Sequence, residues 1–128
     1  MPIELRESFA CDAEDLWNVV GDVARTDWVP DVETCAMEDD VRRMTMRGAG
    51  KVAERILECD AEKRYLRYTV IESAAPLTHH LASIEVRSSG DGSLLLWRTE
   101  AEPEAVLGFI RASMDRCVAR LREIVEST

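Results

Sequence analysis

The chain has 128 residues, a length that fits one domain and leaves no room for two. Its 16 basic and 25 acidic residues give a formal net charge of −9, and a surface of this sign repels phosphate backbones and anionic lipids. We therefore expect a single domain over residues 1–128, monomeric or homodimeric, with neither nucleic acid nor a membrane as a partner.

The N-terminal residues and the cysteines predict a cytoplasmic location. The start MPIELRESFA has no basic stretch followed by an apolar run, so we expect no signal peptide. The cysteines at 11, 35, 59 and 117 are scattered and form no C-x-x-C pair. Because zinc ligands normally come in closely spaced pairs, this pattern predicts free thiols in a reducing compartment and no metal site.

The first 30 residues predict a strand and two short helices. Residues 3–9 alternate between apolar and polar, which is the period of a strand with one wet face. Asp12 is placed to cap a helix and Gly21 to end it. A second short helical turn is expected over residues 23–27, before Pro30 stops it.

Residues 31–101 predict six further strands. The alternating pattern breaks at short segments rich in turn-forming residues, as in consecutive antiparallel hairpins. The expected strands are 32–38, 41–47, 51–59, 64–73, 79–88 and 93–101.

The C-terminal segment predicts one amphipathic helix of about 22 residues that starts at Pro103. Its apolar residues fall within an arc of roughly 120°, and Phe109 lies off this stripe. A helix with one apolar face must bury it, and the sheet is its only large partner. Because a seven-stranded sheet curls, we expect an α+β fold in which a curved antiparallel sheet surrounds the helix and an internal cavity.

Several short motifs follow one another in a characteristic order: LWNVVGD at 16–22, WVPDVE at 28–33, VRR at 41–43, ERILE at 54–58, and the strand from Gly92 to Trp97. In this order the chain resembles the SRPBCC (START-like, helix-grip) superfamily, and within it the polyketide cyclase/dehydrase-like subgroup of bacterial type. It departs from the subgroup at His80, where an aromatic residue is common. The resemblance implies an internal cavity for an apolar ligand; it does not imply a reaction.

Strand alternation selects the side chains expected to face this cavity, if the more apolar face of each strand is the inner one. On the strand 64–73 this places Glu72 on the same face as Tyr68, but its position near the strand end predicts a solvated side chain. Trp28 is expected at the mouth as a gate. The candidate ligand-binding residues are Trp28, Arg42, Met44, Met46, Glu54, Tyr68, His80, Trp97, Ile110, Met114 and Val118.

Some of these residues can carry chemistry. Arg42 and Glu54 share a face on neighbouring strands, so they form either a structural ion pair or a site for a polar ligand group, with Glu54 as a desolvated base. His80 is either an acid–base group or a hydrogen-bonded lining residue, and Tyr68 either a hydrogen-bond donor or a packed ring. His79 points away from His80, so the two cannot chelate one metal.

The leading hypothesis is a carrier or sensor that binds a small apolar or aromatic molecule, polyketide-like or lipid-like, without metal or cofactor. The alternative is a cofactor-free cyclase- or dehydratase-type enzyme that uses Glu54, His80 or Tyr68 for proton transfer. A third alternative, implied by the resemblance, is a protein-interaction module.

Overall fold

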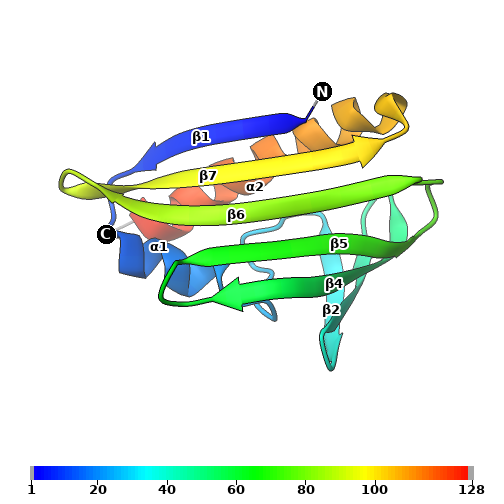
Figure 1. Ribbon diagram of the computed structural model, residues 1–128, viewed down its shortest axis with the longest axis horizontal. Helices are drawn as coiled ribbons and strands as arrows, with labels where there is room; N and C mark the ends of the chain where they lie inside the picture. Colours follow the sequence, from blue (N-terminus) through cyan, green and yellow to red (C-terminus); the bar gives the residue numbers. More distant parts are fainter. Residues whose placement is uncertain (1, 127–128) are drawn as a thin grey trace.

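The computed structural model describes residues 2–126, which form one antiparallel sheet and a long C-terminal helix (Figure 1). The elements are β1 (Ile3–Phe9), α1 (Ala13–Val20), β2 (Val32–Glu38), β3 (Val41–Met46), β4 (Gly50–Asp60), β5 (Tyr65–Ser73), β6 (His79–Ser89), β7 (Gly92–Glu102), a short 3₁₀ turn at Glu104–Val106, and α2 (Leu107–Glu126). The seven strands lie in the order β1-β7-β6-β5-β4-β3-β2. This confirms the predicted fold, and each predicted strand end coincides with the observed end or lies next to it.

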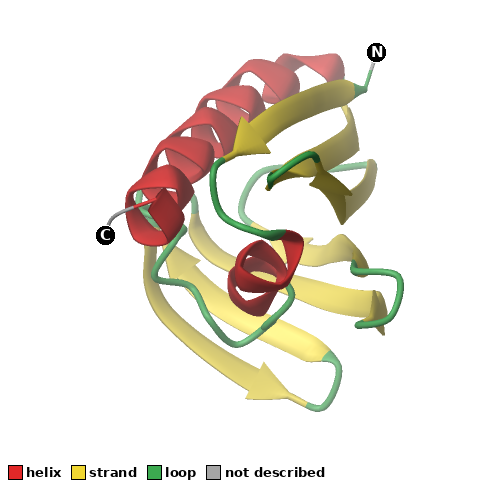
Figure 2. Cartoon of the chain, turned by 90° about the vertical axis from the view of Figure 1, so that its left-hand side faces the viewer, coloured by secondary structure: helices red, strands yellow, loops and turns green. Residues whose placement is uncertain are grey.

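The sheet curls around α2, and α1 lies inside the curl at one end (Figure 2). Helix α2 buries Met114, Cys117, Val118 and Leu121, which belong to the predicted apolar stripe. The largest fully buried side chains include Leu16 of α1, Leu66, Ile84 and Leu95 of the sheet, and Leu121 of α2. One continuous core therefore joins both helices to the sheet.

Helix α1 begins and ends as its sequence predicts. The Asp12 carboxylate accepts a hydrogen bond from the backbone N–H of Asp15 at 2.8 Å, which caps the helix. At the other end Gly21 lies against the indole ring of Trp17, at a separation where a Cβ atom would clash with the ring. Only glycine leaves room for Trp17 to pack there.

The second predicted helix is absent from the described chain, and residues 22–31 form turns instead. Arg25 N–H donates to the Asp22 carbonyl and Val29 N–H to the Thr26 carbonyl, each at 3.0 Å, so the bonds span three residues and do not continue. The Asp22 side chain also accepts from the Ala24 N–H at 3.2 Å, which offers the backbone an alternative to a helix.

A bulge in β5 changes which of its side chains face the cavity. Ala53 of β4 pairs with Glu72, but Glu54 pairs with Val70, so Ile71 has no opposite residue. The extra residue reverses the alternation. Glu72 is consequently exposed and binds Arg43, while Ser73 lines the cavity. The prediction that Glu72 shares a face with Tyr68 is therefore wrong, whereas its predicted solvation is confirmed.

Candidate ligand-binding cavity

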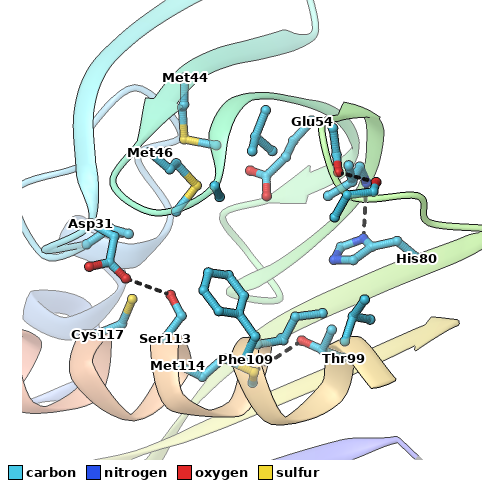
Figure 3. Close-up of a pocket in the computed structure, with 18 of the residues that line it drawn as sticks. Asp31, Met44, Met46, Glu54, His80, Thr99, Phe109, Ser113, Met114 and Cys117 are labelled. Carbon is cyan, nitrogen blue, oxygen red and sulfur yellow. Dashed lines mark hydrogen bonds between the residues drawn. The ribbon is translucent and has the colours of Figure 1, made fainter. Parts of the chain in front are cut away.

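A cavity of about 560 Å³ lies between the concave face of the sheet and α2 (Figure 3). Its walls come from β3 to β7, from the link between α1 and β2, from the loop between β5 and β6, and from the first half of α2. Cavities of this size hold small-molecule ligands. The lining is largely apolar, with a few polar side chains from the sheet.

Nearly all residues predicted to bind a ligand line this cavity: Trp28, Arg42, Met44, Met46, Glu54, Tyr68, His80, Trp97, Ile110 and Met114. Val118 does not line it, because this residue is buried in the hydrophobic core further along α2. A helical wheel gives the direction of a side chain but not the point along the axis where a cavity ends.

Trp28 is placed differently from the expectation. It is only 4% exposed, and its ring lies 5.5 Å from that of Trp97, centroid to centroid. Trp28 is therefore part of the inner wall, packed on another aromatic ring, and not a gate at the mouth.

The mouth includes residues that were not predicted from the sequence. Ala74 and Ala75, in the loop between β5 and β6, line the cavity and are exposed. Phe109 of α2 also lines it and is 53% exposed. Its position off the buried stripe was the available signal, because packing in the core does not account for a large apolar side chain there.

Arg42 and Glu54 lie directly opposite each other on β3 and β4. Nε and Nη2 of Arg42 donate to a single carboxylate oxygen, Oε1, at 3.0 and 2.7 Å. Nη1 donates to the Val23 carbonyl at 3.0 Å. The side chains of Arg42 and Glu54 are only 10% and 13% exposed, so the ion pair belongs to the buried wall.

This arrangement leaves the second carboxylate oxygen of Glu54 available. Oε2 has no hydrogen-bond partner among residues 2–126. Because Glu54 lines the cavity, Oε2 is an acceptor that a bound molecule can reach.

His80 takes the place of a missing backbone hydrogen bond. Strands β5 and β6 pair from Tyr65–Glu85 to Tyr68–Ala82 and then diverge. Beyond that point the Val70 N–H donates to His80 Nδ1 at 3.1 Å, and the Thr69 hydroxyl donates to the His80 carbonyl. Because Nδ1 is the acceptor, the neutral ring carries its hydrogen on Nε2. Burial lowers the pKa of His80, with a smaller contribution from His79, and this favours the neutral form.

The side chain of Tyr68 lies close to both Arg42 and His80. Trp97 Nε1 donates to its hydroxyl oxygen at 3.3 Å, and the Arg42 guanidinium lies 5.4 Å from the centre of its ring. Burial is the main cause that raises the pKa of Tyr68, and the negative charge of Glu54 adds to it. The hydroxyl therefore stays protonated at neutral pH and can donate a hydrogen bond.

A second polar cluster joins the link before β2 to α2. Asp31 is 9% exposed and accepts a hydrogen bond from Arg116 Nη2 at 2.6 Å. It also accepts one from the Ser113 hydroxyl at 3.4 Å (Figure 3). Asp31 and Ser113 line the cavity, and Cys117 lies on the same helix face. Burial raises the pKa of Cys117 to about 12, so this thiol is protonated at neutral pH.

Neither a metal site nor a membrane helix appears in the part of the chain that the structure describes. No group of three or more histidine, cysteine or acidic side chains is arranged there to hold a metal ion. No helix within residues 2–126 has both the length and the apolarity needed to cross a bilayer.

The fold and the cavity define a helix-grip protein, as the sequence motifs imply. The sequence profile of one family, described as polyketide cyclase/dehydrase and lipid transport, matches residues 3–126. The chain belongs to this family. No curated protein matches the sequence.

Solved structures share the fold at low sequence identity. The protein XoxI from Bacillus cereus is 18% identical with a TM-score of 0.90, and the match covers 98% of this chain and 96% of that one. A protein from Thermobifida fusca is 22% identical with a TM-score of 0.79 over 97% and 92% of the two chains. Ara h 8.0201 is 13% identical with a TM-score of 0.80 over 100% and 99%. At these identities the likeness shows the fold alone.

Proposed function

We propose that this protein binds a small apolar or aromatic molecule, polyketide-like or lipid-like, in the cavity between its sheet and α2, and that it acts as a carrier or sensor. The observation that carries the proposal is an apolar cavity of about 560 Å³ whose wall holds a few convergent polar groups. Membership in a family described by cyclase, dehydrase and lipid-transport functions supports an apolar ligand.

The protonation states of His80 and Tyr68 favour ligand binding over proton transfer. His80 Nδ1 accepts from the Val70 N–H, so Nε2 holds the hydrogen and has no lone pair for a substrate proton. Tyr68 is held in its protonated form by burial. Both side chains are suited to donate hydrogen bonds to a ligand and poorly suited to act as a base near neutral pH.

A cofactor-free cyclase- or dehydratase-type enzyme is the second candidate function. It is favoured by one observation, the unpartnered Oε2 of Glu54 on the cavity wall. A carboxylate oxygen in this position can remove a proton next to a substrate carbonyl. The proposal places the protein in the cytoplasm, as a monomer or homodimer without metal or cofactor.

Native mass spectrometry of freshly purified protein tests the proposal. We expect a mass increment from a co-purified small molecule, and its release on denaturation identifies the ligand. Incubation of the refilled protein then separates the two candidates, because a carrier returns the ligand unchanged and an enzyme converts it. If no small molecule co-purifies and apolar fluorescent probes fail to bind, the binding function is wrong.

A further inference from the structure

We propose that Glu54 and His80 restrict the ligand to an uncharged molecule that carries a hydroxyl group, and that the cavity discriminates against carboxylates. This inference rests on the proposed binding function and deepens it. It assigns the two side chains as specificity determinants of the cavity wall. Two features carry it: the charges that line the cavity and the hydrogen-bonding capacity that the protein leaves unused.

The buried cation of the cavity is already neutralised. Each nitrogen of the Arg42 guanidinium donates to a protein oxygen, two of them to Glu54 and one to Val23. A carboxylate ligand beside this pair would lose its hydration without gaining a free positive charge. It would also bring its oxygens toward Glu54 Oε2, which is likewise negatively charged and likewise only accepts hydrogen bonds.

The other cations near the cavity do not change this balance. Arg116 binds Asp31 at 2.6 Å, so its charge is engaged. Arg47 lines the cavity but is exposed, and water screens an interaction there. A carboxylate could therefore be held only at the mouth, against Arg47, with its apolar part inside.

A hydroxyl group matches the unused capacity of the wall. It can donate to Glu54 Oε2 and accept from the Nε2–H of His80, since one oxygen provides both functions. The Tyr68 hydroxyl provides a further donor on the same wall. A ligand without a hydroxyl has no donor for Glu54 Oε2 and leaves this buried acceptor unpaired, which lowers its affinity.

Three naphthalene probes test the inference on the unmodified protein: an acetonaphthone with a hydroxyl on its second ring, the same ketone without the hydroxyl, and the corresponding hydroxynaphthoic acid, which is a carboxylate at neutral pH. We expect the hydroxyketone to bind at least about tenfold more tightly than the plain ketone, the loss typical of an unpaired polar group in a binding site. The acid should bind most weakly of the three.

Two variants identify the side chains responsible. Glu54→Gln frees Arg42 from its partner, so the preference should invert, with the acid gaining and the hydroxyketone losing affinity. His80→Asn keeps an acceptor for the Val70 N–H, because the asparagine oxygen lies near the place of Nδ1, but it removes the Nε2–H donor. It should weaken the hydroxyketone more than the plain ketone. Glu72→Gln, which alters an exposed carboxylate on the outer face, is the control.

The outcomes separate this inference from the proposed function. If all three probes bind with equal affinity, the cavity binds ligands but the selection by Glu54 and His80 is refuted. Tight binding of the acid that is lost in Arg47→Gln would equally refute it, since the carboxylate then sits at the mouth. If no probe binds, the proposed function itself fails. Should Glu54→Gln not fold, the unmodified protein and His80→Asn still decide.

Discussion

Arg42 and Glu54 face each other across β3 and β4, and both hydrogen bonds between them converge on one carboxylate oxygen at 3.0 and 2.7 Å. A two-oxygen contact would have engaged the whole carboxylate, whereas this geometry satisfies the arginine and leaves Oε2 of Glu54 unbound. One oxygen of Glu54, Oε1, thus holds Arg42 in the sheet, and the other, Oε2, is open to the cavity.

The ion pair between Arg42 and Glu54 predicts a loss of stability when one partner is removed. Glu54→Gln leaves Arg42 as a poorly hydrated charge, and the loss for a broken buried pair is about 3 kcal/mol or more. In the double variant with Arg42→Met, part of this loss should be recovered, because the lone charge is gone. Chemical denaturation of both single variants and the double variant measures the three free energies of unfolding. Strictly additive losses would mean that the two side chains do not depend on each other.

The cavity itself can be tested by filling it. Met46 is half-buried on β3 and lines the cavity, so Met46→Trp should place its ring in the empty space. We expect loss of probe binding with little change in the free energy of unfolding. Met114 also lines the cavity but is 3% exposed, so Met114→Trp should cost about 1–3 kcal/mol through overpacking. Fluorescence titration and urea denaturation distinguish the two; an equal destabilisation would indicate a filled core at Met46.

The sequence predicted the architecture well because its signals are local and repeated. Alternation along each strand, the cap at Asp12 and the long stripe of α2 each specify one element, and their order leaves few ways to assemble them. The pairing of Arg42 with Glu54 was predictable for the same reason, since both lie on the apolar face of adjacent strands. The helix expected at 23–27 failed because Asp22 forms a turn that a short segment cannot overcome.

The details of the site depend on features without a sequence period. The unpaired Ile71 reverses the alternation of β5, and the residues around it do not predict this bulge. The divergence of β5 and β6, which turns His80 Nδ1 into a backbone acceptor, is a property of the curved sheet. The end of the cavity along α2, which excludes Val118, depends on how far the core extends. Tertiary packing decides all three.

Phe109 is predicted to control access to the cavity. It is 53% exposed at the mouth, so Phe109→Ala should change the free energy of unfolding by no more than about 0.5 kcal/mol, as for a surface site. The rates of probe entry and release should rise, which stopped-flow fluorescence measures. Leu57→Ala is the matched control, because Leu57 is 41% exposed and lies outside the cavity lining. Equal rates in the two variants would assign Phe109 no part in access.

The cysteines should react in an order set by burial. Cys117 is buried with a pKa raised to about 12, so almost no thiolate forms at neutral pH, whereas Cys59 is exposed. We expect iodoacetamide to label Cys59 first and Cys117 last, with an apolar ligand slowing Cys117 further because this residue lines the cavity. Peptide mass spectrometry over time measures the rates, with urea-denatured protein as the reference. Labelling of Cys117 as fast as Cys59 would mean that water reaches this wall freely.

His80 should make stability depend on pH in one direction. Burial lowers its pKa in the folded protein below the ordinary value of 6.5, while the charge of Glu54 opposes this and that of His79 adds to it. Below pH 6.5 the unfolded chain binds a proton at His80 more readily than the folded chain does, so the folded state loses stability as the pH falls. Above that value the contribution is complete and constant.

The difference between the parent protein and His80→Asn isolates this effect from the many carboxylates, which titrate in both. We expect the free energy of unfolding of the parent to fall more steeply than that of His80→Asn as the pH drops from 7 toward 5, with no difference in slope between pH 7 and 8. Urea denaturation at half-unit steps of pH measures both slopes. The variant keeps the hydrogen bond from the Val70 N–H, so a constant offset between the curves reflects packing, and only the change in slope reports the proton. Parallel curves down to pH 5 would show that the imidazole titrates alike in the folded and unfolded chains, and that the neutral Nε2–H form assigned to His80 is not enforced by the fold.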